Sequence, residues 1–307
     1  MKLKLNILIL LAFVGAVSCR KEEVTQFPDY DQNWLVVNDN PADPATHSSY
    51  LFFKETGIPL YFNDTIGSQQ RVDVFGNTYT HYEKLSFNYS LGGIQVGAPP
   101  MVNSFTYCAK SDVPAAIDFL KNNIIPVLPK GVYVPSILLV ENLSSYAFGQ
   151  YAFKGFNTVL IGKVSTIPGM SATVFRSYKA AILRAIFTNA VLNDKYSALL
   201  TSFYNESRKY STIIDTYNLG SWTFSYNING LPAGVTPSFN ALGFLGSDPR
   251  NSSYTPYTTW MDVSMFLEAA FSNSKADFQR TYGSYTSIMK KYGIITQILE
   301  NIGYKVQ

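Results

Sequence analysis

The 307-residue chain, 47% apolar and 15% charged, is long enough for one large globular domain or two small ones. Without Lys2 and Lys4, which lie in a segment expected to be removed, 22 basic residues face 21 acidic ones. This balance gives no basis for nucleic-acid binding, so we expect no nucleic-acid partner.

The amino terminus carries the features of a lipoprotein signal. Its two lysines precede an apolar run at 5–17, and small residues then lead to Cys19. Thirteen apolar residues are too few to span a bilayer comfortably, which disfavours a transmembrane anchor. We therefore predict a signal peptide at 1–18 and lipidation of Cys19.

The residues after Cys19 indicate where the protein is exported. The triplet Lys21-Glu22-Glu23 resembles the surface-export signal of Bacteroidota lipoproteins. We expect an outer-membrane lipoprotein exposed at the cell surface, with residues 19–31 as its flexible tether.

The rest of the chain changes character near residue 111. Before it, residues 34–90 are polar and aromatic, and they predict turn clusters at 38–49 and 62–70 and short strands at 57–62 and 71–76. After it, apolar periodicity and β-branched runs predict further elements in this order: a helix at 111–126, strands at 135–142 and 157–164, helices at 172–192 and up to 210, an irregular segment at 217–258, and helices at 260–271, 274–283 and 285–304. A sheet followed by helices predicts the α+β class.

Several stretches, taken in order, carry a family resemblance: "AAIDFLKNNIIPVLP", "PSILLVEN", "NTVLIGKV", "YKAAILRAIFTNAVLN", "ALGFLGSDP" and "DVSMFLEAAF". In these the chain resembles the zinc metallopeptidase-like lipoproteins of Bacteroidota, whose genes often accompany outer-membrane nutrient-import systems. The resemblance implies one domain over 32–307, with a gluzincin-like core at 91–307 and a less well-matched part at 32–90. That core is a small mixed sheet followed by helices.

The resemblance also implies a zinc site. The family carries His-Glu-x-x-His on its central helix, where residues four apart share one face and both histidines reach the metal. The glutamate acts as general base, and a later helix with an Asp-Phe-x-Glu-like stretch adds an acidic residue.

This chain departs from the motif at each position. Arg184 and Thr188 stand where the histidines would be, Ala185 replaces the glutamate, and Met265 falls at the later acidic position. Arginine is permanently cationic and cannot ligate zinc, and alanine cannot take a proton. We therefore expect neither a zinc cofactor nor catalysis. If the resemblance fails, the segment around Arg184 is simply a buried core helix.

No other residues suggest a replacement site. The two histidines, His47 and His81, lie far upstream and share no short spacing with each other or with an acidic cluster. Cys108, the lone cysteine after Cys19, is expected to be structural.

Aromatic residues concentrate in the irregular segment 217–258. Trp222, Tyr254 and Tyr257 are the candidates for binding, since exposed rings can stack on sugars or hold peptide side chains. The alternative is that the rings of this segment pack it onto the domain, and we expect that of most of them. The expected function is a non-catalytic accessory to nutrient import, binding peptide, glycan or a partner protein. The alternatives are an active hydrolase with non-standard residues and a purely structural partner of a transporter.

Overall fold

The computed structural model describes residues 32–87, 104–145, 148–231 and 235–306. The predicted signal peptide, Cys19 and the tether lie outside the described residues. The described residues form two compact units, one with residues 32–34 and 68–82 and the other with residues 35–67 and the described residues from 83 onward.

The smaller unit contains the outer part of a β-hairpin, built from β2 (Thr65–Val72) and β3 (Thr78–Lys84). At its turn the Asp73 carboxylate accepts hydrogen bonds from the backbone N–H groups of Phe75 and Asn77. Gly76 adopts φ 85°, a left-handed conformation that favours glycine. The strand predicted at 71–76 is therefore wrong in position: it begins earlier and ends at Val72.

The larger unit contains a five-stranded mixed sheet. β1 (Leu60–Tyr61), β5 (Ile137–Ser144) and β7 (Val159–Ile161) are parallel, and β6 (Ala152–Lys154) is antiparallel to β7 at the end of the order β1-β5-β7-β6. β4 (Ser104–Tyr107) pairs antiparallel with the later part of β5. The predicted strands at 135–142 and 157–164 correspond to β5 and β7, and β4 and β6 were not predicted.

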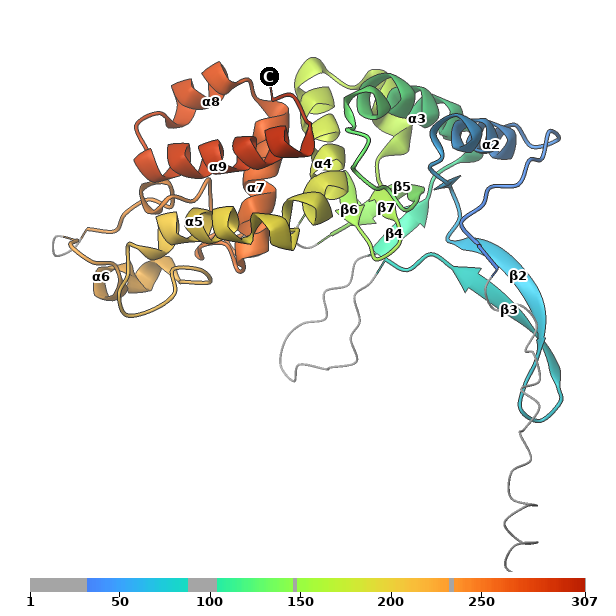
Figure 1. The fold of residues 1–307 in the computed structure, drawn as a ribbon, viewed down its shortest axis with the longest axis horizontal. Coiled ribbons are helices and arrows are strands. Elements are labelled where there is room, and N and C mark those ends of the chain that lie inside the picture. Colours follow the sequence, from blue (N-terminus) through green and yellow to red (C-terminus); the bar gives the residue numbers. More distant parts are fainter. Residues whose placement is uncertain (1–31, 88–103, 146–147, 232–234, 307) are drawn as a thin grey trace, which may run out of the picture. The chain divides into compact units, whose positions relative to one another are not determined.

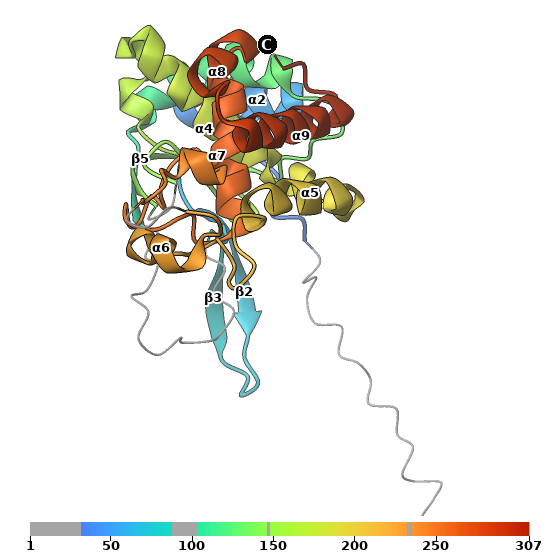
Figure 2. The same ribbon diagram turned by 90° about the vertical axis from the view of Figure 1, so that its left-hand side faces the viewer.

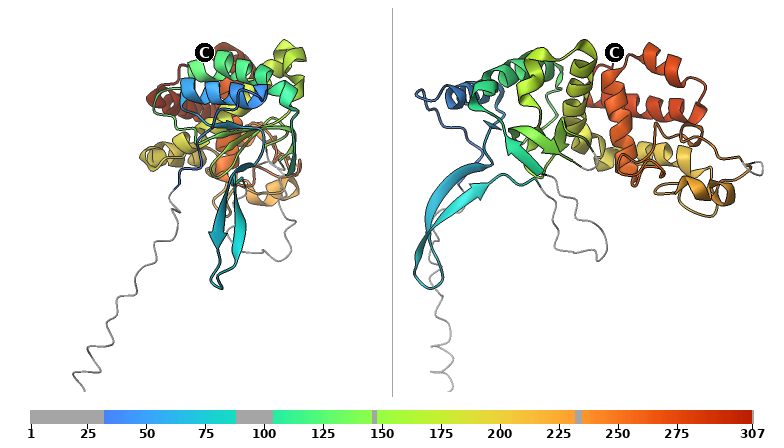
Figure 3. Two further views of the ribbon diagram at one scale, coloured as in Figure 1. Left: turned by 90° about the vertical axis from the view of Figure 1, so that its right-hand side faces the viewer. Right: turned by 180° about the vertical axis from the view of Figure 1, so that it is seen from behind.

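Helices pack on one face of this sheet. Alternation along β5 directs Ile137 and Leu139 into the main apolar core, and Leu138 and Val140 into a smaller cluster on the opposite face. The main core also holds side chains of α2 (Pro44–Thr56), α3 (Val113–Phe119) and α4 (Ala172–Val191). Figure 1 and the left view of Figure 3 show α2 and α3 on the same side of the sheet.

The α-helices that follow α4 are, in chain order, α5 (Ser197–Arg208), α6 (Phe224–Asn227), α7 (Thr259–Ser272), α8 (Lys275–Tyr282) and α9 (Thr286–Ile302). Of these, α7 and α9 pack directly against α4. α4 contacts β6 and α7, and α9 contacts both α5 and α7 (Figure 2). A small mixed sheet followed by helices confirms the predicted α+β class.

One helix overturns a prediction. The cluster at 38–49 was expected to form turns, but α2 begins inside it at Pro44. Asp43 caps this helix by accepting a hydrogen bond from the Ala45 N–H, and proline is favoured in the first turn because it lacks the N–H that would go unpaired there. The Asp-Pro pair is thus a helix start.

Candidate functional site

The helix expected to carry the degenerate motif is α4. Its first turn is capped by Ser171, whose hydroxyl accepts a hydrogen bond from the Val174 N–H. Arg184 and Ala185 are buried in its second half. Thr188 is half-buried and its hydroxyl donates to the Arg184 carbonyl oxygen at 2.7 Å, so it is engaged within the helix.

Arg184 fills the space at the centre of this region. The residue is 1% exposed, and its Nε donates to the Glu268 carboxylate of α7 at 2.9 Å. A terminal nitrogen of the same guanidinium donates to the Ala152 carbonyl oxygen of β6 at 2.9 Å. The guanidinium also lies 4.4 Å from the centre of the Phe148 ring, in cation–π contact. One side chain therefore joins α4, α7 and the edge strand β6.

Burial and pairing with Glu268 shift the pKa of Arg184 in opposite directions. Desolvation lowers the pKa of its guanidinium, while the Glu268 carboxylate opposes that change. Because arginine starts far above neutrality, it stays cationic. The position that the resemblance implies for the first histidine is thus held by a guanidinium that donates to the Glu268 carboxylate and to the Ala152 carbonyl oxygen.

These residues do not fit a zinc ion. Arg184 and Ala185 have no lone pair to offer a metal, and the Thr188 hydroxyl is used by the helix. On α7, Met265 is half-buried and three residues before Glu268. Within the described residues, no three His, Cys, Asp or Glu side chains converge as metal ligands.

Glu268 is the residue that the sequence reasoning missed. The motif alignment placed the acidic position at Met265, but the carboxylate that meets α4 comes from one helical turn later. Its side chain is 42% exposed, whereas that of Arg184 is 2% exposed. The spacing of three residues from Met265 could have suggested it, since residues three apart share a helix face.

A second buried ion pair joins α7 to α9. Lys291 donates to the Asp262 carboxylate at 2.5 Å, and both side chains are fully buried. Lys291 also donates to the Ser207 hydroxyl and to the Gly243 carbonyl oxygen, each at 2.9 Å. The phenol of Tyr217 donates to the same oxygen of Asp262 at 2.7 Å.

Desolvation is the largest cause of the pKa shifts of Asp262 and Lys291. It raises the pKa of Asp262 and lowers that of Lys291, and each charge opposes the change in the other. Desolvation and the Asp262 charge raise the pKa of Tyr217. The second oxygen of Asp262 has no hydrogen-bond partner among the described residues. The side chains of Lys291 and Asp262 are fully buried, so this pair joins α7 to α9 inside the protein.

The histidines and the cysteine do not join any of these groups. His47 contacts the Asp39 carboxylate at 2.7 Å through Nδ1, and His81 lies on β3. Cys108 is buried, donates weakly to the Leu139 carbonyl oxygen, and burial raises the pKa of its thiol to about 11. That thiol stays protonated near neutral pH.

The irregular segment 217–258 presents one exposed indole. Trp222 is 61% exposed and lies 4.9 Å from the Tyr254 ring, edge to face, with their centres as reference. A Cβ added to Gly220 would fall 2.6 to 2.8 Å from three neighbouring atoms of the six-membered ring of Trp222. A point nearly equidistant from three consecutive ring atoms lies over the face of the ring. The indole therefore rests flat on Gly220, and its exposure comes from the opposite face and the free rim.

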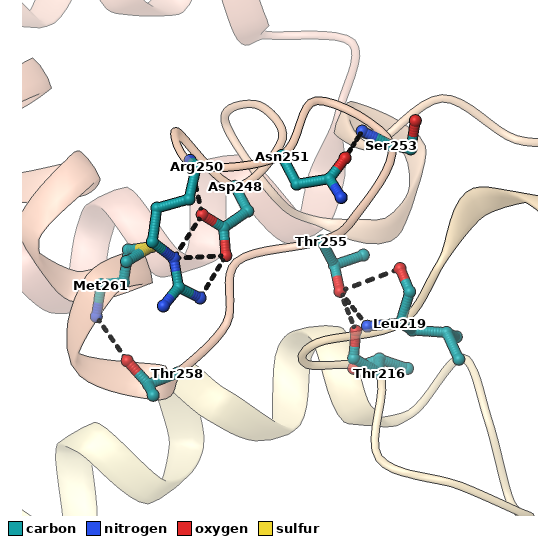
Figure 4. A network of polar contacts seen from close by, with 9 residues as sticks. All are labelled: Thr216, Leu219, Asp248, Arg250, Asn251, Ser253, Thr255, Thr258 and Met261. Carbon is teal, nitrogen blue, oxygen red and sulfur yellow. Dashed lines mark hydrogen bonds and ion pairs between the residues drawn. The ribbon is translucent and has the colours of Figure 1, made fainter. Parts of the chain in front are cut away.

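A polar network holds this segment in shape (Figure 4). Gly220 and Tyr254 form an isolated antiparallel bridge, and the Ser221 N–H donates to the Ser253 carbonyl oxygen at 2.8 Å. Beneath them the fully buried Thr255 hydroxyl donates to the Thr216 carbonyl oxygen and accepts from the Leu219 N–H. The backbone under Trp222 is thus fixed by hydrogen bonds to two distant parts of the segment.

The three predicted binding residues divide into two groups. Trp222 and Tyr254 come together, and Tyr254 is half-buried. Tyr257 is 44% exposed, and its ring is covered by the Arg250 guanidinium at 4.0 Å. Phe224 and Phe244 are fully buried, as expected for rings that pack the segment onto the domain. Tyr226, 81% exposed and one turn after Trp222, is a further exposed ring that was not among the three.

A groove of about 450 Å³ lies elsewhere in the larger unit, lined on α4 by Ile186, Asn189 and Ala190. Its lining includes Lys154, whose ammonium donates to the Gly155 carbonyl oxygen, and the phenol of Tyr133. Within the part of the chain that the structure describes, no carboxylate, imidazole or thiol belongs to this lining.

Comparison with protein-family models, with curated proteins and with solved structures gave no match. Within the described ranges, the helices are too short or too polar for any of them to cross a membrane.

Proposed function

We propose that this chain is a surface lipoprotein with a catalytically inactive metallopeptidase-like domain, accessory to outer-membrane nutrient import. Its role is to bind peptide, glycan or a partner protein. The observation that carries the proposal is the buried guanidinium of Arg184, which stands where the resemblance implies the first zinc ligand and bonds to both α7 and β6.

The surroundings of Arg184 support the loss of catalysis. A water molecule activated for hydrolysis needs a metal or a base next to it, and Ala185 stands where the base would be. Ala185 is fully buried, so substrate does not reach this position. The mixed sheet followed by α4 agrees with the gluzincin-like core that the resemblance implies.

Attachment to the outer membrane is proposed from Cys19 and the tether at 19–31. The import complex is proposed from the resemblance alone.

Two measurements test this function. Purified protein should contain less than stoichiometric zinc after incubation with the metal, and it should not cleave casein, with or without a chelator. The native chain should partition into detergent, whereas Cys19→Ala should remain in the aqueous phase. Stoichiometric zinc together with chelator-sensitive cleavage would overturn the inactive assignment, and detergent partitioning of Cys19→Ala would overturn the anchor.

A further inference from the structure

The face that Trp222 offers to solvent is flat and fixed in orientation. Gly220 supports one face of the ring, and the Tyr254 ring lies perpendicular to it with 4.9 Å between the ring centres. The bridge between Gly220 and Tyr254 holds both supports in register. A side chain this exposed that is nonetheless held by its neighbours loses little conformational freedom when a ligand covers it.

The charge of the surrounding segment limits the ligand. Of the residues at 217–258, Asp248 and Arg250 alone are charged. They pair with each other, with Arg250 donating to both carboxylate oxygens of Asp248 at 2.7 to 3.3 Å (Figure 4). Asp248 is buried, so this pair stabilises the loop. A charged ligand would find no counter-charge here to offset its desolvation.

Neutral polar residues lie in the turn that meets Ser221, the neighbour of Trp222, since the Ser221 N–H donates to the Ser253 carbonyl oxygen. The exposed Asn251 and Ser253 belong to the turn that leads into Tyr254. The Asn251 side-chain oxygen accepts from the Ser253 N–H at 3.1 Å, and its amide nitrogen donates to no group among the described residues. The Asn251 amide and the Ser253 hydroxyl are therefore placed to bond hydroxyl groups of a ligand.

The geometry points to a neutral carbohydrate as the ligand of this surface. The apolar face of a pyranose ring stacks on the free face of Trp222, and sugar hydroxyls bond to Asn251 and Ser253. This inference rests on the proposed non-catalytic binding function and names the ligand class for it. A flat apolar face bordered by hydroxyls matches a flat ring bordered by uncharged amide and hydroxyl groups.

Binding is measured by calorimetry on the purified full-length protein. The probes are neutral hexasaccharides of glucose, mannose and xylose, an acidic hexagalacturonate, and a tryptic digest of casein. We expect at least one neutral hexasaccharide to bind the native protein, and we expect Trp222→Ala to weaken this binding about tenfold or more. Hexagalacturonate should bind the native protein more weakly than the neutral probes do.

One further variant tests the orientation of the indole, and another is a control for loss of an exposed ring elsewhere. Gly220→Ala keeps the indole but places a Cβ 2.6 Å from it, so the ring must swing away and binding weakens. Its backbone φ of −69° suits alanine, so the variant keeps the native melting temperature. Tyr133→Ala removes a ring that is 79% exposed outside the segment, and it should bind as the native protein does.

Four results would overturn the inference: no binding of any neutral hexasaccharide at millimolar concentration, Trp222-dependent binding of casein peptides instead, preference for hexagalacturonate, or equal weakening by Trp222→Ala and Tyr133→Ala. Any of these in a zinc-free, inactive protein would remove the assignment of a neutral carbohydrate and leave the proposed function standing. Zinc-dependent peptidase activity would remove the proposed function itself.

Discussion

Replacing Lys291 with methionine tests how the helical part of the larger unit is held together. The substitution keeps most of the side-chain volume and removes the ammonium. It strands the Asp262 carboxylate in a fully buried position with the Tyr217 phenol as its remaining donor. The Ser207 hydroxyl and the Gly243 carbonyl oxygen lose a donor as well.

The expected loss is large because a buried charge is left without its partner. Breaking a buried ion pair by removing one member lowers the free energy of unfolding by about 3–5 kcal/mol. For a domain of this size that corresponds to a fall in melting temperature of about 10 °C. Lys290→Met, one residue earlier, is the control: Lys290 is 57% exposed and lies 3.4 Å from Glu206, so its loss costs less than about 1 kcal/mol.

Adding Asp262→Asn to Lys291→Met should recover part of the loss. The asparagine removes the stranded charge and still accepts from Tyr217, while the carbonyl oxygen of Gly243 remains without its donor. We expect the double variant to be more stable than Lys291→Met at neutral pH.

The pH dependence gives a second signature. Desolvation already raises the pKa of Asp262 above its ordinary 3.8, and removing Lys291 raises it further. The folded variant then binds a proton that the unfolded chain releases, so its stability falls as pH rises from 3.8 to the folded-state pKa. The deficit relative to the native protein is therefore smallest near pH 4 and largest at neutral pH.

Urea unfolding at pH 7 and at pH 4.5, followed by far-ultraviolet circular dichroism, measures both effects. The reasoning is refuted if Lys291→Met loses no more stability than Lys290→Met. It is also refuted if the Lys291→Met deficit is the same at both pH values and Asp262→Asn recovers none of it.

The pair between α4 and α7 gives two further predictions. Glu268→Ala should destabilise the protein more than Arg184→Met does. Glu268→Ala leaves a buried guanidinium without its carboxylate, whereas Arg184→Met leaves a carboxylate that is 42% exposed. Equal losses of stability in urea unfolding would contradict this. Combining Arg184→His, Ala185→Glu, Thr188→His and Met265→Glu should create a zinc site if the resemblance holds. Zinc should then raise the melting temperature of this variant and not that of the native protein, and metal analysis should find one bound ion; a folded variant that binds none would contradict the resemblance.

The sequence predicted the regular helices of the larger unit well and its first helix poorly. The segment 172–192 was expected as a helix and α4 spans Ala172–Val191, since a long apolar stripe after a capping serine has few alternatives. The cluster at 38–49, which contains the start of α2, was expected as turns because Asn, Asp and Pro are common both in turns and at helix starts. Local composition does not separate these two uses.

The side-chain pairs between residues distant in the chain could not be predicted from the sequence. Lys291 lies on an amphipathic helix, where a lysine is usually solvated, and its burial depends on rings contributed by distant segments. The pairing of Arg184 with Glu268 likewise depends on how α4 and α7 are set against each other. In the irregular segment, Trp222 was selected as a binding candidate because aromatic residues cluster there, but its exposure and its support by Gly220 require coordinates.

The hydrogen bond from Arg184 to the Ala152 carbonyl oxygen also affects how readily another strand could add to the edge of this sheet. β6 is the last strand of its sheet, and an unpaired outer strand invites another extended chain to add beside it, which is a common route to aggregation. The guanidinium already occupies the carbonyl oxygen that such a chain would need at Ala152. An incoming strand would first have to displace the buried guanidinium of Arg184, which is paired with Glu268, so this side chain opposes strand addition at Ala152.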